Sequence, residues 1–352
     1  MILTAKAEKN KQEDTSMKKI VALLVALMMV CSAAAMAATD IAILVPNADH
    51  GWTGAVLTYA EEKAAAINAE GKYEAKVISS ADPANQISQV EDIIENESAK
   101  SIVILPQDNT LEATMKKLAD SGIPFVMFDR VIDSVFDASV ASVKGDNNGI
   151  GAETAKRFIA AGMQPGDNSS VPAMRNEGFF SVLLENGWTQ EQVDAITSTA
   201  YTGWSRSTGK QLFTEWMDAS TVEEITATKW IFTHDDEIGM GILEALKSSE
   251  LDAEKKEAFL TAGVHLAASS GLNEMYSVIK GIHQKDYAAE VAGLADLFTV
   301  TYDPAMIQTA TDDMIAYLAG AEVTKDHVIA VDVVDATNVA EFRGFGDAVA
   351  AE

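Results

Sequence analysis

The chain is 352 residues long and 48% hydrophobic, which is enough to bury a large core and favours two domains over one. Its formal net charge is −27, because 53 Asp and Glu residues outnumber 26 Lys and Arg residues. A surface this acidic repels phosphate backbones and argues against nucleic acid as a partner. The acids are spread along the chain, which indicates a solvated surface and not a docking patch.

The N-terminal segment has the features of an export signal. Lys18 and Lys19 precede an apolar run at 20–30, and small residues ending with Ala37 follow it. This order of basic, apolar and Ala-x-Ala segments is that of a secretory signal peptide, and the run is too short for a comfortable membrane span. We therefore expect residues 1–37 to be leader and signal peptide, and the mature protein to begin near residue 38 in the periplasm.

Two details of this segment leave alternatives open. Residues 1–16 are polar and charged, unlike the front of a signal peptide, so Met17 is the expected start, with a structured extension as the alternative. Cys31, the only cysteine, lies within the signal and leaves the mature chain without a disulfide. A lipoprotein anchor on Cys31 is the alternative to a free protein, but large residues precede it where lipoprotein signals have small ones.

From residue 40 onward, short apolar runs alternate with segments of helical periodicity. In the first half, strands are predicted at 41–45, 73–79, 101–105 and 123–128, with helices at 53–69, 82–95 and 110–120. In the second half, strands are predicted at 139–143, 195–200, 230–233 and 258–263, with helices at 149–161, 207–217, 237–247 and 272–280. This rhythm predicts βαβ units and parallel sheets. Because no long Pro/Gly/Ser linker separates the halves, we expect two lobes joined by short crossovers.

Polar side chains and two tryptophans follow the predicted strands, and ligands of open α/β sheets bind beyond the carboxyl ends of strands. These residues are His50, Trp52, Asp129, Arg130, Trp204, Asp235 and His265. Indole rings cover the apolar C–H faces of a sugar ring, while planar carboxylate and guanidinium groups bond two neighbouring hydroxyls at once. The combination therefore favours a carbohydrate site.

Each of these residues also has a purely structural interpretation. Trp52 or Trp204 alone can be a core side chain. Asp129 and Arg130 can form a surface ion pair, and the acids at 235–237 can cap a helix. The carbohydrate interpretation depends on their joint occurrence at the strand ends.

The sequence resembles the type I periplasmic sugar-binding proteins, the ribose-, galactose- and arabinose-binding group of ABC transporter substrate-binding proteins, over essentially all of residues 40–340. The similarity is most specific at 79–94, 124–130, 145–151 and 234–241. It implies an α/β fold with two doubly wound parallel-sheet lobes joined by a three-segment hinge. The N-terminal lobe would comprise residues 38–143 plus about 303–331, and the C-terminal lobe residues 144–302 plus about 332–352.

The resemblance also implies a set of ligand contacts, carried over residue by residue. They fall on His50, Trp52, Asp129, Arg130, Arg175, Trp204, Asp235, His265 and Tyr302. The second-lobe arginine is aligned with Arg175 to within two positions. Asp235, His265 and Tyr302 depart from the usual ribose ligands, so the resemblance does not specify ribose.

Neither a metal nor another cofactor is expected. His50, His234, Asp235 and His265 could together suggest zinc, but the binding proteins of zinc importers have a different architecture. The calcium loop of galactose binders needs oxygens at alternating positions, and the sequence has no Asp-x-Asp-x-Asp run.

The resemblance implies a monomeric binding protein that carries a monosaccharide or related polyol to an ABC transporter permease in the inner membrane. A periplasmic sensor that presents the ligand to a chemoreceptor or sensor kinase is the alternative. An enzyme is disfavoured, since the sequence has no Gly-x-Gly-x-x-Gly, P-loop, Gly-x-Ser-x-Gly or His-Glu-x-x-His motif. A DNA-binding regulator is disfavoured because a signal peptide, and no helix-turn-helix, precedes the first strand.

Overall fold

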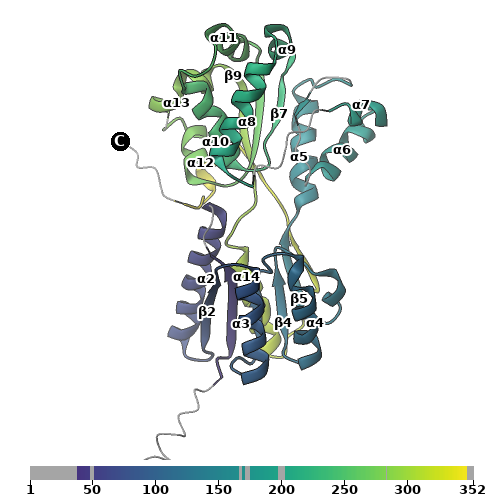
Figure 1. Cartoon of the computed structure of the whole chain (residues 1–352), viewed down its shortest axis with the longest axis vertical. Coiled ribbons are helices and arrows are strands. Elements are labelled where there is room, and N and C mark those ends of the chain that lie inside the picture. The colour runs from purple at the N-terminus through teal and green to yellow at the C-terminus, as the bar shows by residue number, and fades with distance from the viewer. Residues whose placement is uncertain are drawn as a thin grey trace, which may run out of the picture.

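The computed structural model describes residues 38–47, 51–165, 169–170, 175–196, 203–282 and 284–346. Figure 1 shows two lobes stacked along the long axis of the molecule and joined by a narrow waist. Within the described ranges, none of the helices combines the length and the hydrophobicity that a membrane span requires.

The first lobe is built on a six-stranded parallel sheet with the order β10-β5-β4-β3-β1-β2. Its strands are β1 (Ile41–Pro46), β2 (Ala75–Ser80), β3 (Ile102–Ile104), β4 (Phe125–Phe128), β5 (Ala141–Gly145) and β10 (Asp326–Ile329). Its helices are α2 (Gly51–Glu70), α3 (Pro83–Asn96), α4 (Glu112–Ser121) and α14 (Met306–Leu318), with short 3-10 turns η1 (Asn109–Leu111) and η2 (Asp133–Val135).

Helices cover both faces of this sheet, so its strands are apolar on both sides. In β1, Ile41 and Ile43 pack in the core formed with α2 and α14, whereas Ala42 and Leu44 pack in the core formed with α3 and α4. The helix α3 begins where the sequence predicts it: the Asp82 side chain accepts a hydrogen bond from the Asn85 amide, and a proline stands at the first helical position.

The second lobe contains a five-stranded sheet with the order β11-β9-β8-β7-β6. Its strands are β6 (Ser169–Ser170), β7 (Trp230–Phe232), β8 (Val264–Ser270), β9 (Leu294–Thr301) and β11 (Val333–Val334), all parallel except β11. Its helices are α5 (Asn147–Ala160), α6 (Asn176–Glu185), α7 (Gln190–Asp194), α8 (Arg206–Ala219), α9 (Val222–Ala227), α10 (Asp236–Lys247), α11 (Ala253–Thr261), α12 (Asn273–Ile279) and α13 (Gln284–Ala292), followed by a 3-10 turn, η3 (Val339–Glu341).

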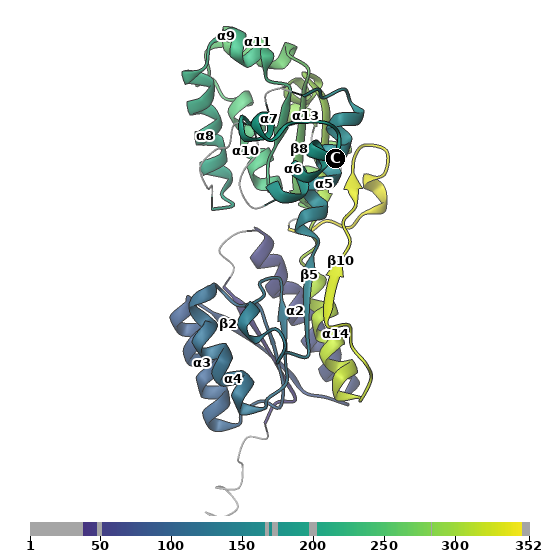
Figure 2. The same cartoon turned by 90° about the vertical axis from the view of Figure 1, so that its right-hand side faces the viewer.

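The chain passes between the two sheets three times, after β5, after β9 and after β10. Figure 2 shows these segments converging in the waist. The predicted α/β fold with two parallel-sheet lobes is confirmed. The extensive contacts between described helices and strands all fall within one lobe or the other.

Two strand predictions in the second half need correction. The strand predicted at 258–263 is wrong. These residues form the end of α11 and the turn after it, and the strand β8 starts only at Val264. Gly263 takes the positive φ of +74° that ends this helix before the strand. Of the predicted strand 195–200, residues 195–196 form a turn after α7, and the rest lies outside the described residues.

Candidate functional site

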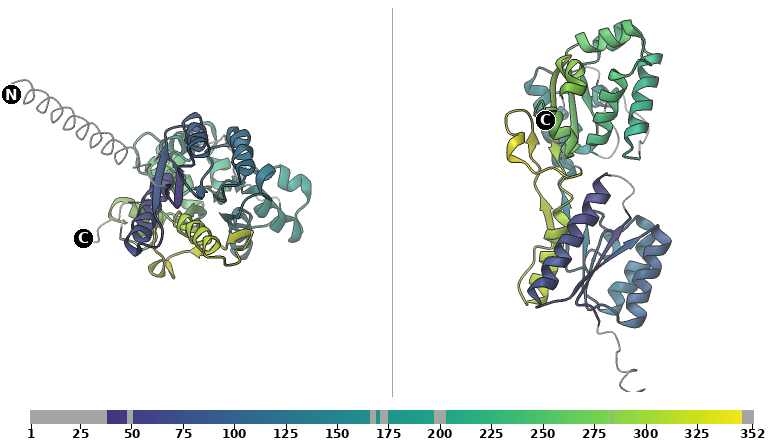
Figure 3. Two further views of the ribbon diagram at one scale, coloured as in Figure 1. Left: turned by 90° about the horizontal axis from the view of Figure 1, so that it is seen from below. Right: turned by 90° about the vertical axis from the view of Figure 1, so that its left-hand side faces the viewer.

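The carboxyl ends of the strands in both sheets lie at the waist. The chain leaves the first sheet from the carboxyl end of β5 and the second sheet from the carboxyl end of β9. The right-hand view of Figure 3 shows the two lobes facing each other across these crossing segments. Residues that follow the strands of either sheet are therefore brought toward one region.

Tyr302, in the second crossing, lies at the centre of this region. Its hydroxyl donates a hydrogen bond to the carboxylate of Asp129, which follows β4, and accepts one of 3.3 Å from the Asn147 side chain at the start of α5. Burial and the Asp129 carboxylate raise the pKa of Tyr302 well above its ordinary value, so the phenol stays protonated and remains a donor. A Cβ atom on Gly145 would overlap the Tyr302 ring, which explains why this crossing carries a glycine.

Arg175 brings a buried cation to the same region. Its side chain donates to the His234 carbonyl (2.6 Å), to the Ser269 hydroxyl and to the Asn147 side chain (3.1 Å), and the residue is only 5% exposed. Burial lowers the pKa of Arg175, while nearby groups that include Asp235 and Asp129 favour its charged form. The predicted arginine position is thus occupied by a guanidinium at the carboxyl edge of the second sheet.

The close packing of α5 against α6 fixes the position of Arg175 at the start of α6. A Cβ on Gly178 would overlap the Asn148 carbonyl, and a Cβ on Gly151 would overlap the Arg175 carbonyl and lie 2.7 Å from the Phe179 amide nitrogen. Because both positions lack a side chain, the two helix N-termini meet directly, which places Arg175 beside Asn147.

The two tryptophans lie on either side of this polar cluster. Trp52 is 9% exposed, stacks on Phe128 with ring centroids 6.0 Å apart and donates its Nε1–H to the Tyr302 carbonyl (2.8 Å). It therefore also has the core role that the sequence left open. Trp204, partly exposed, lies with its ring 5.9 Å from the Arg175 guanidinium and has a positive φ of 60°. Non-glycine residues seldom adopt this backbone conformation, which occurs often at functional sites.

The acids at 235–237 have separate structural roles. Asp235 caps α10 by accepting from the Glu237 amide (2.8 Å), as the helix-cap interpretation expects. Burial and the neighbouring Asp236 raise the pKa of Asp235 well above its usual value. Asp236 accepts from the amides of Gly271 and Leu272, which holds the end of β8. Asp235 and Asp236 both also act electrostatically on Arg175 within the cluster.

Two of the expected contacts lie away from this cluster, and a third cannot be placed because it lies outside the described residues. Arg130 is exposed and donates to the carbonyls of Pro106 and Gln107, beyond the end of β3. His50 lies outside the described residues. His265 is the second residue of β8, where its ring stacks on Trp230 (4.5 Å), so it lies at the amino end of the sheet, away from the waist. Its expected position was wrong because it depended on a strand at 258–263.

Sequence reasoning missed several polar groups at the same edge. Asn147 and Ser269 bond Arg175 directly, and both follow from the true strand and helix boundaries, which the apolar pattern misplaced. Three buried polar atoms without a hydrogen-bond partner also lie beyond strand ends or at the start of α6: Gln107 Oε1, Asn176 Oδ1 and His234 Nε2. Buried polar atoms are nearly always paired, so a polar guest is a natural partner for these three.

His234 predicts an acid sensitivity of folding. Burial, and then the Arg175 charge, lower the pKa of His234 from 6.5 to about 3. Between these values the unfolded chain binds the proton and the folded chain does not, so His234 destabilises the fold progressively as the pH falls below 6.5. We expect this residue to lower the free energy of unfolding by about 2 kcal/mol between pH 7 and pH 5.

The measurement is the free energy of unfolding by urea at both pH values. His234→Gln should reduce the drop between pH 7 and pH 5 by that amount relative to the unsubstituted protein. The control is His327→Gln, because His327 on β10 has a side chain that is 33% exposed. An equal pH dependence in the His234→Gln variant and the unsubstituted protein contradicts the expectation.

Within the described ranges, no group of three or more His, Cys, Asp or Glu side chains has an arrangement that could hold a metal ion. The cluster consists instead of a buried guanidinium, carboxylates, amides, a phenol and two indoles. Such a set offers hydrogen bonds and ring faces to a neutral polar molecule.

Comparison with known proteins agrees with this architecture. Residues 41–322 match the model of the periplasmic binding protein domain. The ribose import binding protein RbsB of Bacillus subtilis is 26% identical over 181 residues, which are 49% of this chain and 54% of that protein. The chain therefore matches about half the length of this relative.

Solved structures extend the similarity over most of the chain. A galactofuranose binding protein has a TM-score of 0.67 at 18% identity, covering 86% of this chain and 96% of that one. A Bacillus halodurans ABC transporter solute binding protein with bound myo-inositol has a TM-score of 0.64 at 20% identity, covering 88% and 98%. The arabinose ABC transporter binding protein of a Shewanella species has a TM-score of 0.65 at 18% identity, covering 86% and 94%. At these identities the likeness shows the fold, and together with the family match it confirms the expected resemblance: the chain belongs to the periplasmic binding protein domain family.

Proposed function

We propose that this protein is the solute-binding component of an ABC-type importer and binds a monosaccharide or related polyol between its lobes. The observation that carries the proposal is the hydrogen-bonded series Asp129–Tyr302–Asn147–Arg175, which runs from the first lobe through the second crossing into the second lobe. Trp52 and Trp204 lie beside this series and offer the ring faces that sugars stack on. The galactofuranose, inositol and arabinose binding of the similar structures supports the same class of ligand.

Hinge closure follows physically from this arrangement. A ligand that contacts Asp129 and Arg175 together gains its full set of bonds only when the lobes approach, so binding increases the population of the closed form. The closed form then presents a surface that a permease can distinguish from the open one. A sensor that reports to a chemoreceptor or kinase would use the same closure and is the second candidate.

The site residues of this proposal come from both lobes. They are Trp52, Asp129, Arg175, Trp204, Asp235 and Tyr302, with Asn147, Asn176 and His234 as additions and with Arg130 at the rim. The export signal at 1–37, the net charge of −27 and the family membership support a monomeric periplasmic protein that works beside an inner-membrane permease.

The direct test is a thermal-shift screen of pentoses, hexoses, inositols and glycerol on purified protein, followed by calorimetry on each hit. A dissociation constant in the micromolar range or below for one of them, without turnover of the ligand, supports the proposal. If no member stabilises the protein, or if the protein consumes a sugar, the proposal fails. Co-purification with a permease or with a chemoreceptor separates the two candidate roles.

Trp204→Ala tests the stacking part of the site. We expect the substitution to weaken ligand binding by about 1–3 kcal/mol through lost apolar burial and stacking, with little change in unfolding, because Trp204 is partly exposed. Trp216→Ala on α8 is the matched control, since Trp216 packs on Phe213 and Phe259 in the core of the second lobe and should affect stability only. Calorimetric titration distinguishes the two, and an unchanged affinity for Trp204→Ala would remove this ring from the site.

A further inference from the structure

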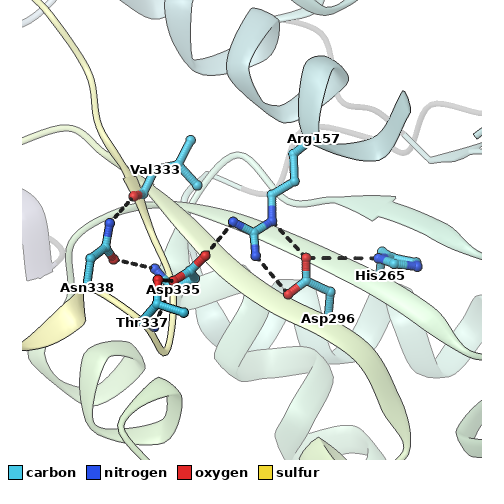
Figure 4. A network of polar contacts seen from close by, with 7 residues as sticks. All are labelled: Arg157, His265, Asp296, Val333, Asp335, Thr337 and Asn338. Atoms are coloured by element: carbon cyan, nitrogen blue, oxygen red, sulfur yellow. Dashed lines mark hydrogen bonds and ion pairs between the residues drawn. The ribbon is translucent and has the colours of Figure 1, made fainter. Parts of the chain in front are cut away.

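A charged network lies at the other end of the second-lobe sheet, remote from the strand ends that face the waist. Arg157 on α5 bonds both oxygens of Asp296 on β9, with Nε–O and Nη–O distances of 2.8 and 3.0 Å, and also donates to Asp335 (2.6 Å), as Figure 4 shows. The His265 ring nitrogen Nδ1 lies 4.0 Å from the same Asp296 carboxylate. The guanidinium lies 4.4 Å from the centre of the Phe298 ring, which covers one of its faces.

The three elements joined by Arg157 are those that continue into the three crossings. The helix α5 follows the first crossing, β9 leads into the second, and Asp335 stands just after β11, which follows the third. One side chain therefore connects three elements that lead into or out of the crossings, at the end of the second lobe remote from the waist. The two carboxylates in Figure 4, those of Asp296 and Asp335, are the bonded partners of Arg157.

Of the three elements, the segment after the third crossing, which begins with β11, depends most on the bonds of Arg157. The strand β11 consists of two residues, Val333 and Val334, paired with Val300 and Thr299. Two hydrogen bonds between Thr301 and Asp332 precede this pairing, and Asn338 and Thr337 fold the loop back onto Asp335. A strand this short gives little intrinsic hold, so the ion pair at Asp335 supplies the next fixed point along the chain.

The lowered pKa values of Asp296 and Asp335 keep both carboxylates ionised at ordinary pH, so their ion pairs with Arg157 persist. Burial raises the pKa of Asp296, but the nearby His265 ring and the bonds from Arg157 outweigh it and bring the value to about 2. Burial also acts to raise the pKa of Asp335. Hydrogen bonds from Thr337 and Arg157 outweigh this effect and lower the pKa below its usual value. All three side chains are less than a third exposed, so solvent screens the network only in part.

We propose that Arg157 is a positioning residue of the hinge: it joins the three crossing segments to one rigid second lobe, and thereby sets the orientation from which the lobes close. The proposal concerns the relative placement of the lobes and touches no ligand contact, so its central test needs no ligand. For ligand binding it rests on the proposed function, because the two half-sites must meet in register.

The test measures the distance between the lobes in the ligand-free protein. The only cysteine, Cys31, is replaced by Ser, and spin labels are placed at two exposed positions through Asp120→Cys on α4 and Glu223→Cys on α9. Arg157→Met should broaden the distribution of label distances, and Asp335→Asn should broaden it less. Arg157→Lys should give a distribution narrower than that of Arg157→Met but broader than that of the unsubstituted protein. Lys156→Met is the matched control, since this neighbouring cation pairs with Glu153 on the exposed surface of the same helix.

Amide hydrogen exchange separates positioning from general stabilisation. In the Arg157→Met variant we expect faster exchange at 332–338, with exchange in α10 unchanged. An unchanged distance distribution overturns the proposal, and so does an acceleration spread evenly over the second lobe, which is the result of a merely stabilising ion pair.

A ligand found in the sugar screen supplies a third measurement. Its dissociation constant should rise about two- to thirtyfold in Arg157→Met, the range of long-range coupling between remote positions. A local increase in exchange without any loss of affinity also overturns the positioning role. If the unsubstituted protein binds no sugar, the proposed function fails, whereas the distance and exchange measurements still decide the role of Arg157.

Discussion

Arg175→Met is expected to lower ligand affinity at least 100-fold. The guanidinium is 5% exposed and donates to the His234 carbonyl, the Ser269 hydroxyl and the Asn147 side chain, all of which lose this donor together. Removing one member of a buried charged network costs about 3–5 kcal/mol, because the remaining groups stay desolvated and unpaired. About 3 kcal/mol in binding corresponds to somewhat more than a 100-fold change in the dissociation constant.

Two further variants make this expectation decisive. Arg175→Lys keeps the positive charge but not the planar fork, so an intermediate affinity is expected. Arg130→Met removes an exposed arginine that bonds the backbone carbonyls of Pro106 and Gln107, and should raise the dissociation constant less than tenfold. Calorimetric titration with the sugar identified in the screen measures all three. A dissociation constant for Arg175→Met within twofold of the unsubstituted value would place this arginine outside the site.

Gly178→Ala is expected to destabilise the protein by about 3 kcal/mol or more. The new methyl group would overlap the Asn148 carbonyl and lie 2.6 Å from its carbon, and this neighbour is backbone that cannot rotate away. The helices α5 and α6 must then separate, and overpacking of this kind costs 1–3 kcal/mol and occasionally more. Because Arg175 stands at the start of α6, the separation should also weaken ligand binding.

Urea unfolding with and without ligand measures both consequences. Glu177→Ala is the control, since it changes the adjacent, exposed position of the same helix. The unfolding midpoint of Gly178→Ala should fall with an unchanged slope, as for a loss of packing in an intact fold. A midpoint equal to that of Glu177→Ala would show that α5 and α6 have room for the methyl group, and that their contact does not set the position of Arg175.

The sequence predicted the strands that position Asp129 and Trp52, the first-lobe members of the candidate site. Asp129 and Trp52 follow strands whose apolar runs are short, fully buried and bounded by Pro or Asp, and the length and the flanking residues of such runs favour a strand. The structure adds that Asp129 pairs with Tyr302, a residue 173 positions away. A hydrogen bond over that separation leaves no local trace in the sequence.

The second lobe was predicted less well for a definite reason. The run 258–263 is apolar at positions that suit either a strand or the buried side of a helix, and local periodicity cannot separate the two over six residues. This shift moved His265 to the wrong end of the sheet and hid Ser269, which lies at the carboxyl end of β8 and bonds Arg175. The error of one element thus changed which residues were assigned to the waist.

The amino-acid sequence by itself determined the fold class, the alternation of strands and helices and the family, because buried apolar runs and helix caps are local features that survive without knowledge of partners. Only the tertiary structure decided that Arg175 is buried against Asn147 and Ser269, that the Tyr302 hydroxyl bonds Asp129, and that Arg157 bonds both Asp296 and Asp335. These contacts depend on how α5 packs on α6 and on where the chain returns to each sheet, and both are set by the balance of packing over the whole chain.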